Sequence, residues 1–187
     1  MNEKKVPIAY LEETRAVIWD IESARRIFSM GFYGKPMGIY KPKSADFNVP
    51  LVLDLIEAAY LAKKGKIKLY DKRKGKFLSL KEIFEYSEKT YERFKEKFMV
   101  YEDLRDSGYV VTSGMKFGST FAVYRKGPGI DHAPYIVDVM LKDDEIGSTE
   151  IIRAGRLATT VRKRFIIAVP YPFIGKVEYL LFKWWRA

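Results

Sequence analysis

Hydrophobic residues follow a helical spacing in the first half of the chain and a strand spacing in much of the second half. Between Tyr91 and Gly108, apolar residues recur at intervals of three and four, which predicts a long helix that ends near Gly108. After Gly108 the pattern changes to short apolar runs separated by glycine-bearing turns, which is typical of strands. The change indicates two parts with different architecture.

The second part is predicted to form a mixed sheet with at least one helix. Ser148 can cap a helix that runs to about Arg162. Short apolar runs predict strands before and after this helix, at residues 109–112, 121–124, 135–141, 165–169 and 177–185.

The first part is predicted to combine helices with short extended pieces. Pro50 is suited to the first residue of a helix, and Gly65 lies where a left-handed C-terminal cap is needed. The sequence Ser79-Leu-Lys-Glu82 has the pattern of a capping box, which predicts the start of another helix. Residues 14–30 fit an amphipathic helix or a helix mixed with a strand, and residues 67–70 fit a short strand.

We therefore expect an α/β fold, mixed α+β, with two domains. Their boundary falls inside or beside the long helix, where the hydrophobic pattern changes. It separates a small N-terminal α/β domain, residues 1–94, from a C-terminal domain, residues 95–187, in which helices flank a mixed β-sheet.

The composition excludes several classes of function. The chain has no cysteine and a single histidine, His132, so disulfides, thiolate nucleophiles and cysteine-based zinc sites are impossible. One histidine also excludes any metal site with two histidines from one chain. We expect neither a metal nor a cofactor.

Charge and hydropathy bear on the partners. A formal net charge of +10 over 187 residues favours a polyanionic partner such as a nucleic acid, although the basic residues are spread along the chain and locate no site. Apolar runs fall far short of the roughly 20 residues needed to cross a bilayer, and no signal-peptide core follows Met1. We expect no membrane contact and a cytoplasmic location.

Three side chains have the chemistry to cleave RNA without a metal. Such cleavage uses the neighbouring 2′-hydroxyl as nucleophile and needs a base, an acid for the departing 5′-oxygen and a cation for the charge at phosphorus. Tyr124 ends a predicted strand, His132 lies in a turn eight residues later, and Lys163 lies where the last predicted helix meets a strand. The phenol of Tyr124 can act as a base if cations favour its phenolate, and Arg125, Lys126 and Lys163 are candidates.

Each of these residues also has a structural explanation. A tyrosine at a strand end is often an amphipathic edge residue, and a histidine on a loop is often simply solvated. Arg162, Lys163 and Arg164 could form a solvated cap that favours the helix dipole, or one of them could bind a phosphate. The residues alone leave both explanations open.

Three separated segments resemble a known nuclease family in their order and spacing. They are residues 103–128, the sequence Asp131-His-Ala-Pro-Tyr-Ile-Val and the sequence Val161-Arg-Lys-Arg. From about Tyr101 onward the chain resembles the catalytic domain of the archaeal tRNA-splicing endonucleases. Tyr33-Gly-Lys-Pro and residues 55–65 resemble the accessory domain of that family less specifically.

The resemblance implies a catalytic subunit that excises introns from precursor tRNA. It implies metal-independent cleavage at bulge-helix-bulge motifs, which leaves a 2′,3′-cyclic phosphate and a 5′-hydroxyl. On the matching positions, Tyr124 is the general base, His132 the general acid and Lys163 the stabiliser of transition-state charge. Residues 1–94 are then the accessory domain and residues 95–187 the catalytic nuclease domain.

The resemblance also implies contacts with RNA. Enzymes of this family hold a bulged base between cationic or aromatic side chains from an opposing subunit. Arg156 matches one such position, and Trp184 is a looser candidate for the other, although Trp184 could instead be buried at a strand edge or interface. Arg125, Lys126 and Arg162 are further candidates for RNA binding.

Oligomers are the third implication. In this family a C-terminal strand pairs between subunits, and an acidic loop of one subunit enters a basic cleft of another. Asp143, Asp144 and Glu145 match that loop, although three acids before a helix could also be solvated. Tyr179 and Leu181 lie on the apolar C-terminal strand. We expect a homo-oligomer or a heterotetramer with a related structural subunit.

Two other functions stay open. The chain could be a non-catalytic RNA-binding or assembly subunit of the same complex. It could also be a metal-dependent nuclease on a related fold, with Asp131, Asp138 and Glu150 as the metal ligands.

Overall fold

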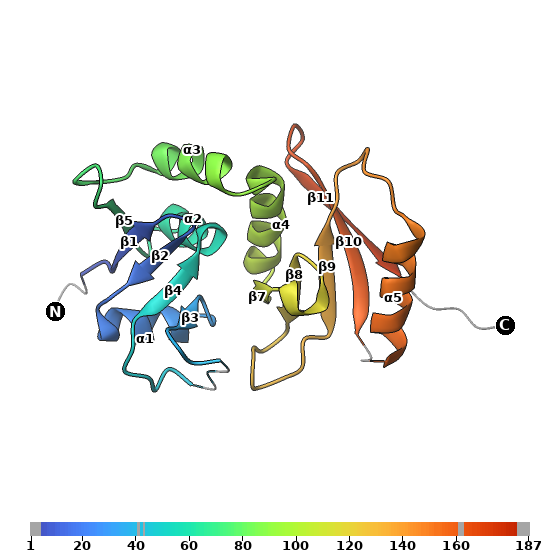
Figure 1. The fold of residues 1–187 in the computed structure, drawn as a ribbon, viewed down its shortest axis with the longest axis horizontal. Helices are drawn as coiled ribbons and strands as arrows, with labels where there is room; N and C mark the ends of the chain where they lie inside the picture. Colours follow the sequence, from blue (N-terminus) through green and yellow to red (C-terminus); the bar gives the residue numbers. More distant parts are fainter. Residues whose placement is uncertain (1–4, 41, 43, 161–162, 183–187) are drawn as a thin grey trace. The chain divides into compact units, whose positions relative to one another are not determined.

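The computed structural model describes residues 5–40, 42, 44–160 and 163–182, with side chains described except at residues 157–160. The chain divides into two compact units between Phe94 and Lys95 (Figure 1). Each unit has its own mixed sheet and helices, which confirms the predicted mixed α/β fold.

The N-terminal unit is built on a sheet with the strand order β3-β4-β2-β1-β5-β6. Its strands are β1 (Ile8–Glu12), β2 (Arg15–Ile18), β3 (Lys35–Pro36), β4 (Leu51–Asp54), β5 (Lys68–Asp71) and β6 (Lys76–Phe77). The pairing of β1 with β5 is parallel, and the other pairs are antiparallel. Alternate residues of β1 and β5, such as Ala9, Leu11 and Leu69, are buried, so one face of the sheet packs on the core.

Side-chain caps fix where the three helices of this unit begin. The Asp20 carboxylate accepts the backbone N–H of Ser23 at the start of α1 (Ile21–Ser29). Capping boxes open α2 (Leu55–Lys63) and α3 (Leu80–Thr90), and the box of α3 is the predicted Ser79–Glu82 pair. Gly65, after α2, has the expected positive φ of 66°.

Two predicted helix boundaries are wrong. Pro50 does not begin a helix, because the next residues form β4 and α2 starts only after the cap Asp54. The helix predicted from Tyr91 starts at Phe94, because Arg93 has φ 55° and separates it from α3. Residues 14–30 follow the mixed alternative, with β2 before α1.

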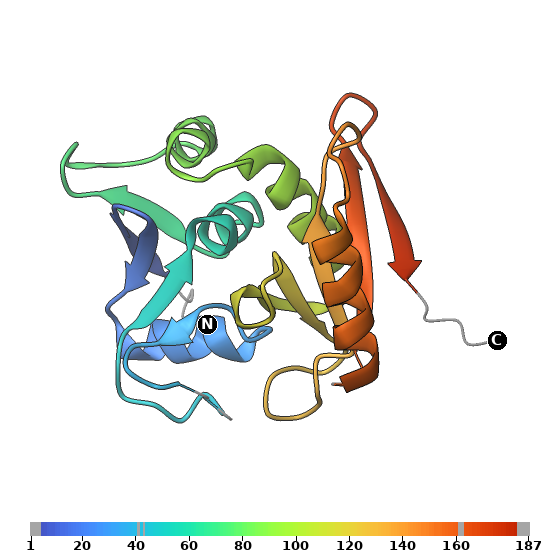
Figure 2. The ribbon, with the colours of Figure 1, turned by 45° about the vertical axis from the view of Figure 1, so that its right-hand side comes forward.

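The C-terminal unit has a sheet with the order β11-β10-β9-β8-β7 (Figure 2). Its elements are α4 (Phe94–Asp106, which begins at the unit boundary), β7 (Val110–Ser113), β8 (Phe121–Tyr124), β9 (Tyr135–Val139), α5 (Ser148–Thr160), β10 (Arg164–Tyr171) and β11 (Lys176–Phe182). A short 3₁₀ turn, Met115–Phe117, precedes β8. All five strands expected in this part are present. β9 ends two residues earlier than predicted, β10 extends beyond the predicted residues, and residues 183–185 of the last predicted strand lie outside the described residues.

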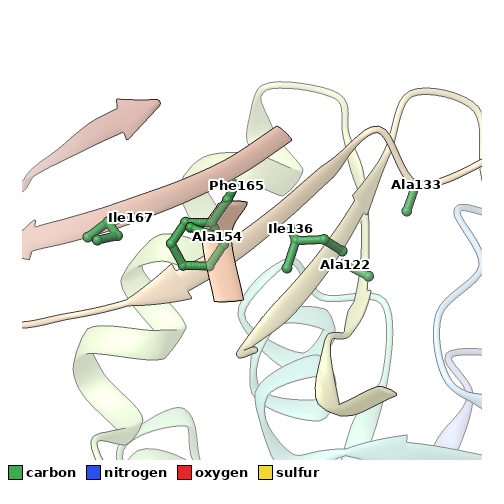
Figure 3. Packing of buried hydrophobic residues seen from close by; sticks show 6 residues of the cluster. All are labelled: Ala122, Ala133, Ile136, Ala154, Phe165 and Ile167. Atoms are coloured by element: carbon green, nitrogen blue, oxygen red, sulfur yellow. The ribbon is translucent and has the colours of Figure 1, made fainter. Parts of the chain in front are cut away.

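A hydrophobic cluster packs α5 against the strands β8, β9 and β10 (Figure 3). Its buried members are Ala122, Ala133, Ile136, Ala154, Phe165 and Ile167, and Phe117 and Tyr124 pack against it half-buried. Ala133 precedes β9, and Phe165 follows the start of β10. The cluster therefore anchors the end of the sheet at which β9 and β10 begin. In the described part of the chain, no helix is long and apolar enough to cross a membrane.

Gly34 and Gly38 offer a matched test of close packing in the N-terminal unit. Both have positive φ, but a Cβ on Gly34 would lie 2.7 Å from the carbonyl oxygen of Val52, whereas one on Gly38 would meet nothing within 4 Å. We expect Gly38→Ala to lower the free energy of unfolding by about 1 kcal/mol through the left-handed backbone. Gly34→Ala should cost at least about 1 kcal/mol more, because the backbone of β4 must shift. Urea unfolding of the two variants measures the difference, and equal losses would contradict the close approach.

Candidate active site

The strand pairing brings Tyr124, His132 and Lys163 to one end of the C-terminal sheet. Strand β8 runs antiparallel to β9, and β9 runs parallel to β10, so the last residue of β8 lies at the end where β9 and β10 begin. Tyr135 is paired with Val123 on one side and Arg164 on the other. Tyr124 directly follows Val123, and Lys163 directly precedes Arg164.

Tyr124 is the last residue of β8 and is half-buried against the hydrophobic cluster. Burial raises the pKa of its phenol, and the nearby Asp131 carboxylate raises it further, while a hydrogen bond with Thr112 acts in the opposite direction. Arg125, one of the cations expected to favour the phenolate, donates instead to the Tyr135 hydroxyl at 3.1 Å. The surroundings of Tyr124 therefore raise the pKa of its phenol and do not favour the phenolate, contrary to that expectation.

The loop between β8 and β9 is closed by the Asp131 carboxylate. It accepts the backbone N–H groups of Arg125 and Lys126, each at 3.2 Å, and that of Gly127 at 2.8 Å. These three hydrogen bonds lower the pKa of Asp131 although desolvation opposes them. His132 follows this clamp directly, and its side chain is exposed. The clamp therefore holds the chain just after Tyr124 next to the residue just before His132.

Lys163 folds back onto the chain beside His132. Its Nζ donates to the carbonyl oxygen of Ala133 at 2.6 Å and lies 4.9 Å from the centre of the Phe117 ring. Partial burial lowers its pKa, and the like charge of Lys116 lowers it further. Lys163 is thus a partly desolvated cation at the strand end, and the solvated-cap explanation does not describe it.

Two arginines, Arg125 and Arg164, gather around Tyr135 at the same end of the sheet, and the sequence did not predict this Tyr135 cluster. The guanidinium groups of Arg125 and Arg164 lie 6.0 and 5.9 Å from the centre of the Tyr135 ring, and the edge of the Tyr109 ring contacts it at 6.1 Å between centroids. The hydrogen bond from Arg125 and the two positive charges lower the pKa of Tyr135. Paired residues share a sheet face, so Tyr135 and Arg164 lie on the face opposite Tyr124. Their position as first residues of adjacent strands was the available signal.

The other residues expected to bind RNA are only partly described. Arg156 is exposed on α5, and the side chain of Lys126 is exposed at the β8–β9 loop. Arg125 is also exposed, within the Tyr135 cluster. Arg162 and Trp184 lie outside the described residues.

The residues expected at subunit contacts lie on the surface of the C-terminal unit. Asp143 and Glu145 are exposed, while Asp144 accepts the backbone N–H of Leu141 at 2.8 Å and shapes the loop before α5. Tyr179 and Leu181 are 38% and 42% exposed on β11, the outermost strand of the sheet. The Tyr179 hydroxyl donates to Asp103 at 2.6 Å.

The carboxylates suggested for a metal-dependent nuclease serve other contacts. Asp138 accepts the N–H and hydroxyl of Thr120, at 2.9 and 3.1 Å, and forms an ion pair with Arg153. The Asp131 carboxylate accepts the three backbone N–H groups of the β8–β9 loop. Among the residues that the structure describes, no three carboxylate or imidazole side chains gather as a metal site would require. The geometry does not bring Asp131, Asp138 and Glu150 together.

One end of the C-terminal sheet thus carries a tyrosine, an exposed histidine and a partly desolvated lysine, three side-chain types that can take part in proton transfer and charge stabilisation. Comparison with known proteins defines the class. Residues 8–84 match the family described as tRNA intron endonuclease, N-terminal domain, and residues 94–179 match the family described as tRNA intron endonuclease, catalytic C-terminal domain. The chain belongs to the tRNA intron endonuclease family and is an RNA-cleaving enzyme of tRNA splicing.

Archaeal relatives match nearly the whole chain. A protein of Hyperthermus butylicus named tRNA-splicing endonuclease is 48% identical over 94% of this chain and 97% of its own length. Proteins with the same name from Sulfurisphaera tokodaii and Saccharolobus islandicus are 44% and 45% identical, over 95% and 94% of this chain and 98% and 97% of their own lengths.

The clamp predicts that Asp131 controls the order of the β8–β9 loop. In Asp131→Asn, the side-chain amide cannot accept all three N–H groups, and the charge that strengthens them is lost. We expect hydrogen exchange at Arg125 and Lys126 to accelerate at least about tenfold, because a hydrogen bond to a charged group contributes about 1.5–3 kcal/mol. RNA cleavage should fall in parallel. Asp46→Asn, at an exposed carboxylate of the N-terminal unit, is the control and should change neither quantity. Unchanged protection in Asp131→Asn would show that the clamp does not order the loop.

Proposed function

We propose that this chain cleaves precursor tRNA at bulge-helix-bulge motifs without a metal, leaving a 2′,3′-cyclic phosphate and a 5′-hydroxyl. In this proposal residues 95–187 form the catalytic domain and residues 1–94 the accessory domain. The supporting observation is that Tyr124, His132 and Lys163 come from the adjoining ends of three neighbouring strands, with Lys163 in contact with the residue after His132. The family membership of both units supports the choice of RNA.

Each side chain has one role in the proposed reaction. The 2′-oxygen forms a bond to phosphorus while the bond from phosphorus to the 5′-oxygen breaks. Tyr124, as phenolate, takes the proton of the 2′-hydroxyl, and His132, as imidazolium, gives a proton to the departing 5′-oxygen. The ammonium of Lys163 lies against the non-bridging oxygens, where negative charge increases in the transition state.

The environment of each group sets what it contributes. Because burial raises the pKa of Tyr124, its phenolate is a minor but strongly basic species at neutral pH. Because Lys163 is partly desolvated, its interaction with a developing charge is stronger than that of a fully hydrated lysine.

Further residues fit RNA contacts in the same proposal. Arg156 on α5 and Trp184 are proposed to hold a bulged base, while Arg125, Lys126 and Arg162 bind the backbone. Of these, Arg125 and Lys126 lie in the loop that directly follows Tyr124, and their side chains are exposed.

A complete enzyme is proposed to contain more than one chain, either as a homo-oligomer or with a related structural subunit. The acidic loop with Asp143, Asp144 and Glu145 and the outer strand β11 with Tyr179 and Leu181 are the proposed contacts. The support is that β11 is the outermost strand and that its apolar side chains are 38–52% exposed from Tyr179 to Leu181.

Cleavage of an intron-bearing precursor tRNA in excess chelator tests the reaction. We expect the wild-type chain to cleave at both junctions. The 3′ ends of the products should resist ligation of a 3′ adapter until the cyclic phosphate is opened and the resulting monophosphate is removed, and their 5′ ends should accept phosphate from a polynucleotide kinase without prior phosphatase treatment. Tyr124→Phe, His132→Ala and Lys163→Ala should each lower the single-turnover rate at least about 100-fold. Lys142→Ala, at an exposed lysine of the same unit, should keep the wild-type rate.

Two results would contradict this proposal. If chelator abolishes cleavage and Mg²⁺ restores it, the enzyme is a metal-dependent nuclease. If the three variants cleave at the wild-type rate when reconstituted with a wild-type partner subunit, the chain is a non-catalytic subunit.

The pKa of Lys163 gives the alkaline limit of activity. The folded-state pKa lies below 10.5, so the cation needed for catalysis is present at neutral pH and is lost as pH rises through that lowered value. Lys116→Gln removes the like charge that lowers this pKa, so the alkaline limb of kcat/KM should move to higher pH. Lys142→Gln should leave the limb in place. A limb that does not move in Lys116→Gln, or moves to lower pH, would show that Lys163 does not set it.

A further inference from the structure

The N-terminal sheet has one face that carries aromatic side chains. Tyr10 is paired with Tyr70, and Tyr70 is paired with Phe77. Because directly paired residues project from the same face of a sheet, these three rings share one face. Ala9 and Leu69, their neighbours in sequence, are buried on the opposite face. The rings therefore lie on the side of the sheet that faces away from the core of this unit.

The rings form a continuous row across neighbouring strands. The centroids of Tyr10 and Tyr70 are 5.8 Å apart, and those of Tyr70 and Phe77 are 5.1 Å apart. Phe77 at one end is 49% exposed. Trp19, which follows β2, is 47% exposed. The ring of Phe77 at one end of the row, and the ring of Trp19 near Tyr10, are thus open to a ligand.

Lysines lie over these rings. Nζ of Lys72 is 5.2 Å from the centre of the Tyr10 ring and 5.8 Å from that of Trp19. Nζ of Lys68 is 6.0 Å from the centre of the Phe77 ring. The row therefore alternates aromatic surface with positive charge.

The surrounding chain is strongly basic. Residues 63–76 contain eight lysines or arginines and one acid, Asp71. Asp71 is buried, and its carboxylate accepts the backbone N–H groups of Arg73 and Lys74 at 2.8 and 3.3 Å. The acid therefore shapes the turn between β5 and β6 and is not displayed beside the cations. Nζ of Lys72 lies 3.5 Å from Oε1 of Glu12. This ion pair is half-exposed and therefore weak, so a phosphate can take the place of the Glu12 carboxylate.

We propose that this surface, the aromatic face (Tyr10, Trp19, Lys68, Tyr70, Lys72 and Phe77), binds unpaired nucleotides of the substrate RNA. Unpaired bases stack on aromatic side chains while lysines neutralise the backbone, and this combination tolerates any base sequence. A protein partner is a poorer fit, because the centres of protein interfaces are depleted of charge. The identity of the ligand as part of a precursor tRNA rests on the proposed function, whereas its class, single-stranded RNA, rests on the rings and cations.

Binding of an unstructured twelve-nucleotide oligouridylate to the full chain, followed by fluorescence anisotropy, tests the cations. The double variant Lys68→Gln/Lys72→Gln should raise Kd at least about fivefold and reduce the slope of log K against log salt by about 0.7 for each phosphate that it no longer neutralises. The matched control is Lys81→Gln/Lys89→Gln, which removes two exposed lysines from α3 and should change Kd less than twofold. Equal losses of affinity in the two double variants would overturn the proposal.

Truncation of the exposed rings tests stacking. Trp19→Ala and Phe77→Ala should each raise Kd for oligouridylate at least about fivefold and change Kd for a fully paired RNA duplex less than twofold. Circular dichroism and urea unfolding establish that the variants are folded. Weaker binding of duplex and single strand to the same degree, or no change in either, would overturn the proposal.

Two outcomes separate this inference from the proposed reaction. These assays need no cleavage, so a chain that binds oligouridylate through the aromatic face but does not cut precursor tRNA would contradict the proposed reaction alone. If Lys68→Gln/Lys72→Gln instead changes the oligomeric state measured by sedimentation and leaves RNA affinity unchanged, the face is a protein contact and the inference is wrong.

Discussion

The parallel pairing of β9 with β10 is the constraint on which the candidate active site depends. Its first backbone hydrogen bond runs from the N–H of Arg164 to the carbonyl of Pro134 at 2.8 Å, and Lys163 immediately adds its own bond to Ala133. A slip of one residue would turn Lys163 to the other face of the sheet. The hydrophobic cluster around Ile136 opposes such a slip, because Ile136 and Phe165 are paired in this register and are both buried in the cluster.

The same cluster sets the ionisation of the groups that it positions. Tyr124 packs against the cluster and is partly desolvated, which raises its pKa, and partial burial lowers the pKa of Lys163. The two shifts have opposite signs but one cause, since burial disfavours the charged form of both groups. In the proposed reaction, the RNA phosphate then compensates the lysine by pairing with its charge, while the tyrosine gains basic strength from its high pKa.

Local signals in the sequence predicted the parts of the fold that depend on neighbouring residues. The capping box at Ser79 needs only Glu82 three residues later, and it was found from the sequence. The prediction of a helix at Pro50 was wrong because β4 forms by pairing with β2, in which Leu51 lies opposite Ile18. The local sequence, a proline followed by apolar residues, does not reveal this distant partner. The break at Arg93 was missed for the opposite reason, because a single left-handed residue hardly disturbs the spacing of apolar positions.

For the candidate site, too, the sequence predicted the local features but not the contacts between distant residues. The types of its three residues, and their positions next to predicted strands, could be found along the chain, as could the likeness of the surrounding segments to a nuclease family. The contacts that give them their properties could not, because they join distant residues: Lys163 to Ala133 and to Phe117, and Arg164 to Tyr135. The loop clamp is short-range, but an aspartate that accepts three N–H groups looks in sequence like an exposed acid beside a turn.

Contacts to neutral groups explain how a basic chain keeps its cations available for RNA. An ion pair with a carboxylate would fix the ammonium of Lys163 but cancel its charge. A carbonyl oxygen and an aromatic ring fix it without cancelling that charge, and the carbonyl takes only one of the three N–H donors of a lysine. Arg164 over Tyr135 and Lys68 over Phe77 show the same kind of contact in the two units. The net charge of +10 is therefore not merely spread over the surface, because at these positions neutral partners hold cations in place with their charge intact.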